Sequence, residues 1–288
     1  MVDVSIIIVN YNCHQMLCDC LASVYKYTVD VRFEIIVVDN ASTDGSEQCV
    51  RSSFPQVRWV NSGDNIGFGR ANNLGAERAQ GKYLFLLNAD TLLLNNAVKL
   101  FFDYAEARQG ERLGVLGCRL CDKVGKPNNS AGDFPTPLSE ARYLLQKAVL
   151  AKAKENAGVA DVGYVIGADM FVRRDVFREF GGFDPHFFMY YEETDLQYRM
   201  AQRGYQRRLI DGPRIVHLEG GSFAKGGLTF GRFVMAQKSY NYYLRKHFSG
   251  LRYILYKGSL ALIRLTLFAT TDWLVKEKFK AYFNVLKK

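Results

Sequence analysis

Apolar residues along the first ninety positions fall into short runs separated by stretches of helical periodicity. Predominantly apolar runs of four to six residues occupy positions 4–9, 33–38, 57–60 and 83–87. Such runs are typical of strands that are buried on both faces of a sheet. Between them, apolar positions at helical spacing predict helices over residues 15–27, 46–54 and 70–80. This alternation predicts an α/β domain with a parallel sheet and right-handed crossovers.

Each predicted strand is followed by a polar segment, and these segments meet at one edge of the sheet. Asn10, Tyr11 and Asn12 follow the first strand, Asp39 follows the second, and residues 61–65 follow the third. Ligands of open α/β sheets bind at the carboxyl ends of the strands. The sequence therefore predicts a binding site at this edge.

The fourth strand is followed by an amide and a carboxylate, Asn88 and Asp90. In extended chain, residues two positions apart point to the same side. Oxygen ligands of this kind suit a hard divalent cation and the diphosphate that it carries. An ordinary turn after a strand also favours Asn and Asp, and it is the structural alternative.

Three acidic side chains, Glu192, Glu193 and Asp195, follow the aromatic run at 187–191. A helix is predicted over residues 196–202, so the acidic group lies at a helix amino terminus, where the backbone dipole favours negative charge. Capping explains one acidic residue there, but it does not require three. Burial beside aromatic rings raises a carboxylate pKa and suits it to general base catalysis.

The chain lacks the phosphate loops of the common nucleotide-binding folds. Gly67 and Gly69 form its only G-x-G, far from the first strand, and Asn72 stands where a dinucleotide-binding fingerprint has its third glycine. No P-loop pattern occurs. Hydride transfer on a Rossmann domain and nucleotidyl transfer on a glycine-rich loop are both disfavoured.

Positive charge is concentrated at the carboxyl-terminal end of the chain. Of 288 residues, 48% are hydrophobic, which is enough for one large domain or for a domain with an appendage. Residues 245–288 carry ten basic and two acidic residues, whereas the rest of the chain has a net charge of +1. The apolar stretch at 251–268 is interrupted by Arg252, Lys257 and Arg264. This pattern is typical of an interfacial helix on an anionic membrane.

Two helices that pack on the catalytic domain, or in a homodimer, are the alternative for this tail. No nucleic-acid-binding motif accompanies the charge, so no nucleic-acid partner is expected. No apolar run approaches the roughly 18 to 20 residues of a membrane-spanning helix.

The six cysteines are expected to be free thiols. The chain starts without a basic segment before its first apolar run, so no export signal is predicted and a cytoplasmic location is expected. Cys118 and Cys121 form a C-x-x-C pair, but no second pair with matching spacing completes a zinc site. The cysteines lie at positions 13, 18, 20, 49, 118 and 121.

Several ordered segments together resemble the family 2 glycosyltransferases, and their rhamnosyltransferase-like branch in particular. In the first half these are VSIIIVNYN, EIIVVDNASTDGS, NIGFGRANNLG and YLFLLNADT. The likeness continues through GADMFVRRDVFREFGGFDPHFFMYYEETDLQYRMAQRGY and IVHLEGGS, so that it covers residues 4–222. It implies a GT-A fold, an α/β domain whose mixed, mostly parallel sheet is flanked by helices, here with a C-terminal helical extension.

The resemblance also divides the chain. Residues 1–225 are expected to form the catalytic domain, with a nucleotide-binding half at 1–110 and an acceptor-binding half at 111–225. Residues 226–288 are expected to form a basic amphipathic helical tail. A surface loop is predicted over 123–137, and a basic helix over 142–154.

Residue roles on the nucleotide side follow from the resemblance. Asn65 and Gly67 match a turn that approaches the sugar nucleotide, where glycine allows close approach of the backbone. Asn88 and Asp90 match the D-x-D motif of the family, with Asn in the first place. The loops that hold nucleobase and ribose correspond to Asn10, Tyr11, Asn12 and Asp39.

The resemblance assigns a metal site and a catalytic base as well. Asp90 and His217 are the expected ligands of Mn²⁺ or Mg²⁺, and a neutral imidazole favours Mn²⁺. Glu193 occupies the position of the base, while Glu192 and Asp195 remain alternatives. Asp169 matches a strand on the acceptor side, near the sugar.

The implied activity is inverting transfer from a nucleoside-diphosphate sugar to a hydroxyl of a glycan or lipid-linked saccharide. The donor implied is dTDP-rhamnose or a UDP-sugar, and the setting is synthesis of surface polysaccharide at the inner face of the cytoplasmic membrane. The alternative is a catalytically inactive sugar-nucleotide binder or partner subunit, since Asn88 removes one anionic ligand from the motif.

Overall fold

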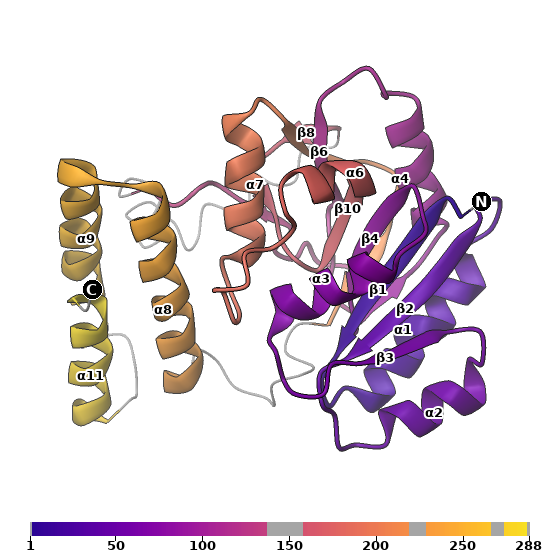
Figure 1. The fold of residues 1–288 in the computed structure, drawn as a ribbon, viewed down its shortest axis with the longest axis horizontal. Coiled ribbons are helices and arrows are strands. Elements are labelled where there is room, and N and C mark those ends of the chain that lie inside the picture. The colour runs from indigo at the N-terminus through magenta and orange to yellow at the C-terminus, as the bar shows by residue number, and fades with distance from the viewer. Residues whose placement is uncertain (1, 137–157, 219–228, 266–273, 287–288) are drawn as a thin grey trace.

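A mixed eight-stranded sheet forms the centre of the molecule (Figure 1). The computed structural model describes residues 2–136, 158–218, 229–265 and 274–286. The helix predicted over 142–154 lies outside these residues. In spatial order the sheet contains β3 (Arg58–Asn61), β2 (Phe33–Asp39), β1 (Val4–Asn10), β4 (Tyr83–Asn88), β10 (Asp169–Arg173), β6 (Leu113–Cys118), β11 (Gln206–Ile210) and β8 (Ala160–Asp161).

The first four strands in the chain are parallel, as the sequence predicts, and the later strands make the sheet mixed. Strand β1 lies between β2 and β4, with Asn10 opposite Asp39 and Val9 opposite Asn88. Strand β10 runs antiparallel to both β4 and β6. The polar residues that end β1, β2 and β4 therefore lie at the same edge of the sheet.

Helices cover both faces of the sheet and create two hydrophobic cores. Ile6 and Ile8 of β1 pack with residues of α1 and α4, whereas Ile7 packs on the opposite face with residues of α3, α6 and α7. Alternate residues of a strand point to opposite faces. Burial of both faces is why β1 and β4 are almost continuously apolar.

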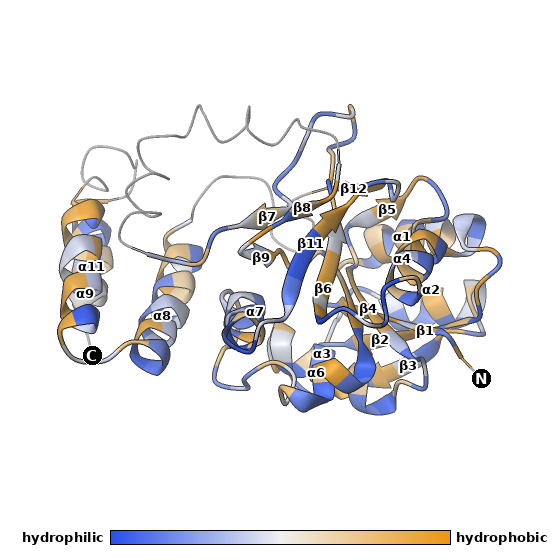
Figure 2. Ribbon diagram, turned by 90° about the horizontal axis from the view of Figure 1, so that it is seen from above, coloured by the Kyte–Doolittle hydropathy of each residue, from blue (hydrophilic) through white to orange (hydrophobic). Residues whose placement is uncertain are grey.

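The helices of the sheet domain begin and end within two residues of the predicted limits where a prediction was made, except that α7 begins four residues before the predicted start at residue 196 and so includes the acidic group. Their bounds are α1 (His14–Tyr27), α2 (Ser46–Ser53), α3 (Phe68–Arg78), α4 (Ala97–Glu106), α6 (Arg174–Glu179) and α7 (Glu192–Gln202). Figure 2 shows α3, α6 and α7 together on one side of the strands.

Two short sheets complete the edge that carries the polar segments. Strand β5 (Thr91–Leu93) pairs with β12 (Ile215–His217), and β7 (Ala131–Gly132) pairs with β9 (Tyr164–Val165). Only Ala89 and Asp90 separate β4 from β5, because Thr91 already belongs to the next strand. The surface loop predicted over 123–137 is interrupted by β7.

Helices α8 (Phe230–His247), α9 (Gly250–Arg264) and α11 (Val275–Leu286) follow the sheet domain. In both views α8 lies beside α7, while α9 and α11 lie farther from the sheet (Figures 1 and 2). Within the described part of the chain, no helix combines the length and the hydrophobicity needed to span a membrane. The domain boundary at residues 225 and 226 stays a prediction.

Aromatic packing holds α8 against the sheet domain. Tyr240, Tyr243 and Leu244 of α8 are buried in one cluster with Phe187, which precedes α7. The Ser239 hydroxyl also donates a hydrogen bond of 2.7 Å to the carbonyl oxygen of Met189. The first helix of the predicted tail is therefore part of the wall around the sheet edge.

Candidate active site

The sheet edge opens into a pocket of about 550 Å³. Its walls come from the loops after β1, β2, β3 and β4, from the start of α7, from the end of β12 and from α8. The structure thus brings together side chains that are more than two hundred residues apart in sequence. The sequence-predicted residues that line it are Tyr11, Asn65, Asn88, Asp90, Glu192, Glu193 and His217.

Asp90 and His217 meet because two short strands pair. In the β5–β12 ladder His217 lies opposite Thr91, one residue beyond Asp90. The Asp90 carbonyl also accepts a hydrogen bond of 2.9 Å from the Leu218 amide. These constraints place His217 Nε2 3.4 Å from Asp90 Oδ1.

The residues at this position fit a divalent cation. The Asp90 side chain is 10% exposed and that of His217 12%, and both line the pocket. An imidazole and a carboxylate that converge while largely buried form a donor set suited to Mn²⁺. Asn88 contributes a neutral oxygen from the same wall.

The reason predicted for the pairing of Asn88 and Asp90 was wrong, although both residues line the pocket. Asn88 is the last residue of β4, and the chain then turns at Ala89 and Asp90 instead of continuing extended. The turn, together with the β5–β12 ladder, directs Asp90 into the pocket.

Asn40 holds the loops on the nucleotide side together. Its amide nitrogen donates to Asn65 Oδ1 at 3.1 Å and to the Gly67 carbonyl at 3.3 Å. Its side-chain oxygen accepts a hydrogen bond of 3.1 Å from the Ile66 amide. Asn40 also lines the pocket. It was missed in the sequence, although it directly follows Asp39.

The described residues that line the pocket do not include Asn10, Asn12 or Asp39. Asn10 is fully buried and donates 2.9 Å to Asp39 Oδ1. Asn12 is exposed, and its Oδ1 accepts from the Thr43 amide at 2.8 Å. Asp39 lines a separate hollow with Ser42. These polar side chains bind the β1 and β2 loops to each other.

Gly67 is required by a contact within the protein. Its φ is +86°, and a Cβ built there would lie 2.2 Å from the carbonyl oxygen of Phe188. The Phe68 amide donates a hydrogen bond of 3.0 Å to that same oxygen. The close approach expected toward a sugar nucleotide is, in this structure, an approach to the loop before α7.

A strained turn presents the acidic start of α7 to the pocket. Tyr190 and Tyr191 have φ values of 70° and 68°. This left-handed region costs a non-glycine residue about 1–3 kcal/mol. The chain then enters α7 with Glu192 and Glu193 in the pocket wall.

The two glutamates are held in a low-polarity environment. Burial raises the pKa of Glu193 above its usual range. Burial, and after it the charge of Glu193, raise the pKa of Glu192 well above its usual range. Glu192 is 4% exposed, and its Oε2 accepts no hydrogen bond from the described residues. The pair thus offers two carboxyl groups that bind a proton more strongly than an exposed glutamate does.

Asp195 lies on the other face of the same helical turn. It is completely buried, and its carboxylate binds Arg199 at 2.9 Å, Lys246 at 2.8 Å and His247 at 2.7 Å. Burial raises its pKa, but the His247 hydrogen bond and the charges of Arg199 and Lys246 outweigh burial and lower it. The structure does not bring Asp195 to the pocket, where two of the three acidic residues meet.

Asp169 is also separated from the pocket, contrary to its expected place near the sugar. It is fully buried in the sheet, and its Oδ2 accepts a hydrogen bond of 2.7 Å from the Cys118 amide. Burial raises the pKa of Asp169 to about 7. Its neighbour Ala168 lines the pocket instead.

The comparisons with known proteins identify the family. Residues 5–181 match the model of Glycosyl transferase family 2. The chain belongs to this family. The matched region contains most of β1, all of β2 to β4 and the Asn88–Asp90 motif. The assignment of Asn88 and Asp90 to the D-x-D position of the family stays a prediction.

Relatives in family 2 extend the likeness over most of the chain. The N-acetylglucosaminyl-diphospho-decaprenol L-rhamnosyltransferase of Mycobacterium tuberculosis is 27% identical, with 79% of this chain and 81% of that protein covered. The low-salt glycan biosynthesis hexosyltransferase Agl10 of Haloferax volcanii is 26% identical, with 68% and 61% covered. The expected likeness to rhamnosyltransferases is confirmed.

Solved glycosyltransferases share the fold at low sequence identity. A mannosyltransferase from Pyrobaculum calidifontis, in complex with GDP-Man and Mn²⁺, superposes with a TM-score of 0.58 at 16% identity and covers 98% of this chain and 84% of its own. GalNAc-T7 with UDP, GalNAc and Mn²⁺ gives 0.59 at 18% identity and covers 88% and 52%. The GT-A fold is confirmed, and this family 2 chain is a glycosyltransferase.

Helix α8 supplies a part of the candidate site that was not predicted from the sequence. Arg232 and Met235 of α8 line the pocket together with His217. Arg232 lies on a helix whose basic character the sequence showed, but nothing in its spacing distinguished it from the other basic residues. Only the packing of α8 beside α7 reveals its position.

Proposed function

We propose that this protein is an inverting glycosyltransferase that moves a sugar from a nucleoside diphosphate to a hydroxyl of a lipid-linked saccharide. One observation carries the proposal. A single pocket is lined by Asp90 and His217, which fit a metal–diphosphate group, and by Glu193, which fits a general base. Tyr11 and Asn65 line the same pocket and can contact the nucleoside.

The chemistry follows from this arrangement. Glu193, as its carboxylate, accepts the proton of the acceptor hydroxyl. The acceptor oxygen forms a bond to the anomeric carbon while the bond from that carbon to the diphosphate oxygen breaks on the opposite face, so the configuration inverts. The bond electrons leave with the nucleoside diphosphate. Asp90 and His217 would hold a divalent ion, which when bound would provide positive charge next to the leaving diphosphate.

The raised pKa of Glu193 fits this role. A base whose pKa lies nearer to neutrality binds the transferred proton more strongly than an exposed glutamate does. Because the carboxylate is the active form, we expect kcat/KM to fall as the pH drops through this raised pKa. Arg232 adds a cationic group on the α8 wall that can meet the diphosphate.

The donor and acceptor classes are proposed from the relatives. The rhamnosyltransferase similarity supports dTDP-rhamnose as donor, with UDP-sugars as the next choice, and it supports a polyprenyl diphosphate saccharide as acceptor. A glycan without lipid remains an acceptor to be tested alongside. The inactive-subunit alternative rests on Asn88 alone.

A donor panel tests the proposal. The purified chain is incubated with Mn²⁺ or Mg²⁺, a polyprenyl-diphosphate N-acetylglucosamine acceptor and, in turn, dTDP-rhamnose, a UDP-sugar or GDP-mannose. We expect transfer from one donor, with an inverted anomeric configuration in the product by NMR. Donor binding without transfer or hydrolysis across the panel would instead support the inactive subunit, and a retained configuration would contradict the base assignment.

Contact with an anionic membrane is proposed for the outermost helices, because a lipid-linked acceptor lies at a bilayer surface. Leu251, Ile254, Leu255 and Leu262 of α9 are between 58% and 70% exposed, at helical spacing. Figure 2 shows hydrophobic segments at the surface of α9 and α11. Basic residues border this apolar stripe, as in interfacial helices.

Vesicle sedimentation separates membrane binding from dimerisation. We expect the protein to pellet with phosphatidylglycerol vesicles, and Leu251→Asp combined with Leu262→Asp to abolish pelleting. The control is Val124→Asp, which replaces an apolar side chain that is 76% exposed outside the tail. Equal pelleting of all three proteins would remove the membrane role, and loss of a dimer in the double variant would assign the stripe to self-association.

A further inference from the structure

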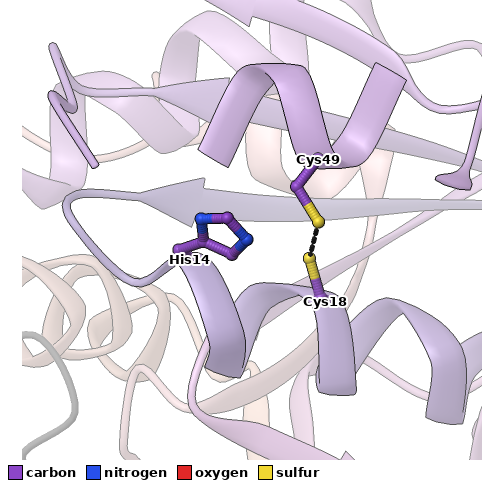
Figure 3. Close-up of side chains that lie close together, drawn as sticks. All are labelled: His14, Cys18 and Cys49. Carbon is purple, nitrogen blue, oxygen red and sulfur yellow. Dashed lines mark hydrogen bonds between the residues drawn. The ribbon is translucent and has the colours of Figure 1, made fainter. Parts of the chain in front are cut away.

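Three metal-binding side chains from two helices converge away from the pocket (Figure 3). His14 and Cys18 lie four residues apart on α1 and therefore share one helix face, and Cys49 lies on α2. The sulfur atoms of Cys18 and Cys49 are 2.7 Å apart. One ligand atom from each of the three residues lies within 4.8 Å of the others. None of the three is among the described pocket residues.

A backbone contact orients the histidine ring for metal binding. His14 Nδ1 lies 3.0 Å from the carbonyl oxygen of Asp44. A carbonyl can only accept, so Nδ1 carries the proton and Nε2 keeps its lone pair. Figure 3 shows the ring edge directed toward the two sulfur atoms. Histidines that bind metals are commonly fixed in this way, with the other ring nitrogen donating to a carbonyl.

The loop that provides this carbonyl is itself anchored. The His14 amide donates a hydrogen bond of 2.8 Å to Asp44 Oδ2, and Asp44 Oδ1 accepts from the Ser46 amide at 3.1 Å. The start of α1, the loop before α2 and α2 are therefore held together before any ion binds. Preorganisation of this kind lowers the cost of bringing three ligands to one point.

The donor set selects the metal. Two thiolates and one imidazole are soft and borderline ligands, which favour Zn²⁺ over Mg²⁺ or Ca²⁺. Around a tetrahedral ion with bonds of about 2.3 Å, two sulfur atoms lie roughly 3.8 Å apart. Cys18 and Cys49 thus need to separate by about 1 Å, which rotation of two partly exposed side chains allows.

We propose that His14, Cys18 and Cys49 bind one Zn²⁺ ion, with a water molecule as the fourth ligand. All three side chains are partly exposed, so solvent reaches the open position. The ion would connect α1 to α2 behind the loops that contain Asn12 and Thr43. This proposal is independent of the proposed sugar transfer.

Cobalt substitution tests the site in the full-length protein. Any purification tag that binds metal is first removed, and the thiols are kept reduced with a phosphine. Co²⁺ is then titrated in, followed by Zn²⁺. We expect one equivalent of Co²⁺ to give a thiolate charge-transfer absorption that one equivalent of Zn²⁺ removes. Asp90 and His217 provide no sulfur ligand, so Asp90→Asn should leave this absorption unchanged.

Single variants assign the ligands. Cys18→Ser and Cys49→Ser should each weaken Zn²⁺ binding by at least about tenfold, since loss of a direct ligand costs no less than loss of a supporting contact. The matched control is Cys121→Ser, because Cys121 is also half-buried but lies elsewhere, with its thiol near the Ile215 carbonyl. It should bind Zn²⁺ like the parent chain.

Three results would overturn the proposal. The first is no charge-transfer absorption in the reduced parent chain. The second is unchanged Zn²⁺ affinity in Cys18→Ser. The third is a disulfide between Cys18 and Cys49 in protein purified in air, seen as two fewer titratable thiols and a mass lower by two hydrogen atoms, together with no Zn²⁺ binding after reduction. That result would make the pair a disulfide site only.

Discussion

The first turn of α7 places two acidic residues in opposite electrostatic environments, although both belong to one acidic segment. Glu193 faces a pocket in which burial raises its pKa. Asp195, two residues later, faces α8, where the His247 hydrogen bond and cationic partners lower its pKa. Residues two apart on a helix do not share a face. One acidic segment therefore supplies both a candidate base and an anchor.

The anchor connects the site to the tail. Lys246 and His247, which bind Asp195, are the last residues before the end of α8, and the same helix brings Arg232 to the pocket. The acidic motif thus positions the α8 wall as well as supplying the candidate base. Substitutions on the two faces should separate catalysis from stability.

The largest effect is expected for Glu193→Gln. Loss of general base action should lower kcat by about 10² to 10⁴, while donor affinity stays close to that of the parent chain. Because burial raises the pKa of Glu193, a neutral side chain relieves a cost of folding above the usual pKa of glutamate. The free energy of unfolding at pH 7 should therefore not decrease.

Steady-state kinetics with the active donor and urea denaturation measure both quantities. Glu193→Asp serves as the matched control, because it keeps the carboxylate but shortens it by one methylene, and it should retain more activity than the Gln variant. Full turnover in Glu193→Gln would contradict the assignment and direct attention to Glu192.

Asp195→Asn should have the next largest effect, on stability. It leaves Arg199, Lys246 and His247 without their common anion, and breaking a buried ion pair costs about 3 kcal/mol or more. The pKa of Asp195 is lowered in the folded state, so its contribution is present above pH ~4 and is lost as the pH falls through the lowered pKa. The cost of the substitution should shrink in the same range.

Urea denaturation between pH 3 and pH 7 checks this expectation. Asp161→Asn is the control, since Asp161 also pairs with an arginine but its side chain is 70% exposed, and it should cost less than about 1 kcal/mol. A loss of activity in folded Asp195→Asn as large as that in Glu193→Gln would erase the distinction between the two faces.

How far the sequence predicted the site depends on which interactions place each residue. Asn88, Asp90 and Tyr11 follow buried strands, and the apolar pattern of those strands was enough to locate them. His217 lies beside Asp90 only because of the β5–β12 ladder, and β12 contributes just three residues to that ladder. Its local signal was too short to predict a strand.

The rest could not be predicted because it depends on contacts between distant segments. Nothing in the polar loops shows that Asn10 and Asp39 bind each other while Asn40 faces the pocket. Arg232 enters the site through the packing of Tyr240 and Tyr243 against the aromatic run. The pattern of apolar residues in a segment predicts which of its side chains are buried, but it does not predict which other segment packs against them.

Glu192→Gln should have the smallest effect on activity, although Glu192 is more deeply buried than Glu193. Gln has the shape of the protonated parent side chain, so it should lower kcat far less than Glu193→Gln does. At a pH below the usual pKa of glutamate, where both side chains are neutral, it should change the free energy of unfolding by less than about 1 kcal/mol. For an acid whose pKa is raised by folding, stability falls as the pH rises from the unfolded pKa toward the folded one. Relative to the parent chain, Glu192→Gln should therefore gain stability in urea denaturation as the pH rises above the usual pKa of glutamate, about 4.3. A relative loss over that range would mean that Glu192 is ionised in the folded protein, and Glu192 would then compete with Glu193 for the role of base.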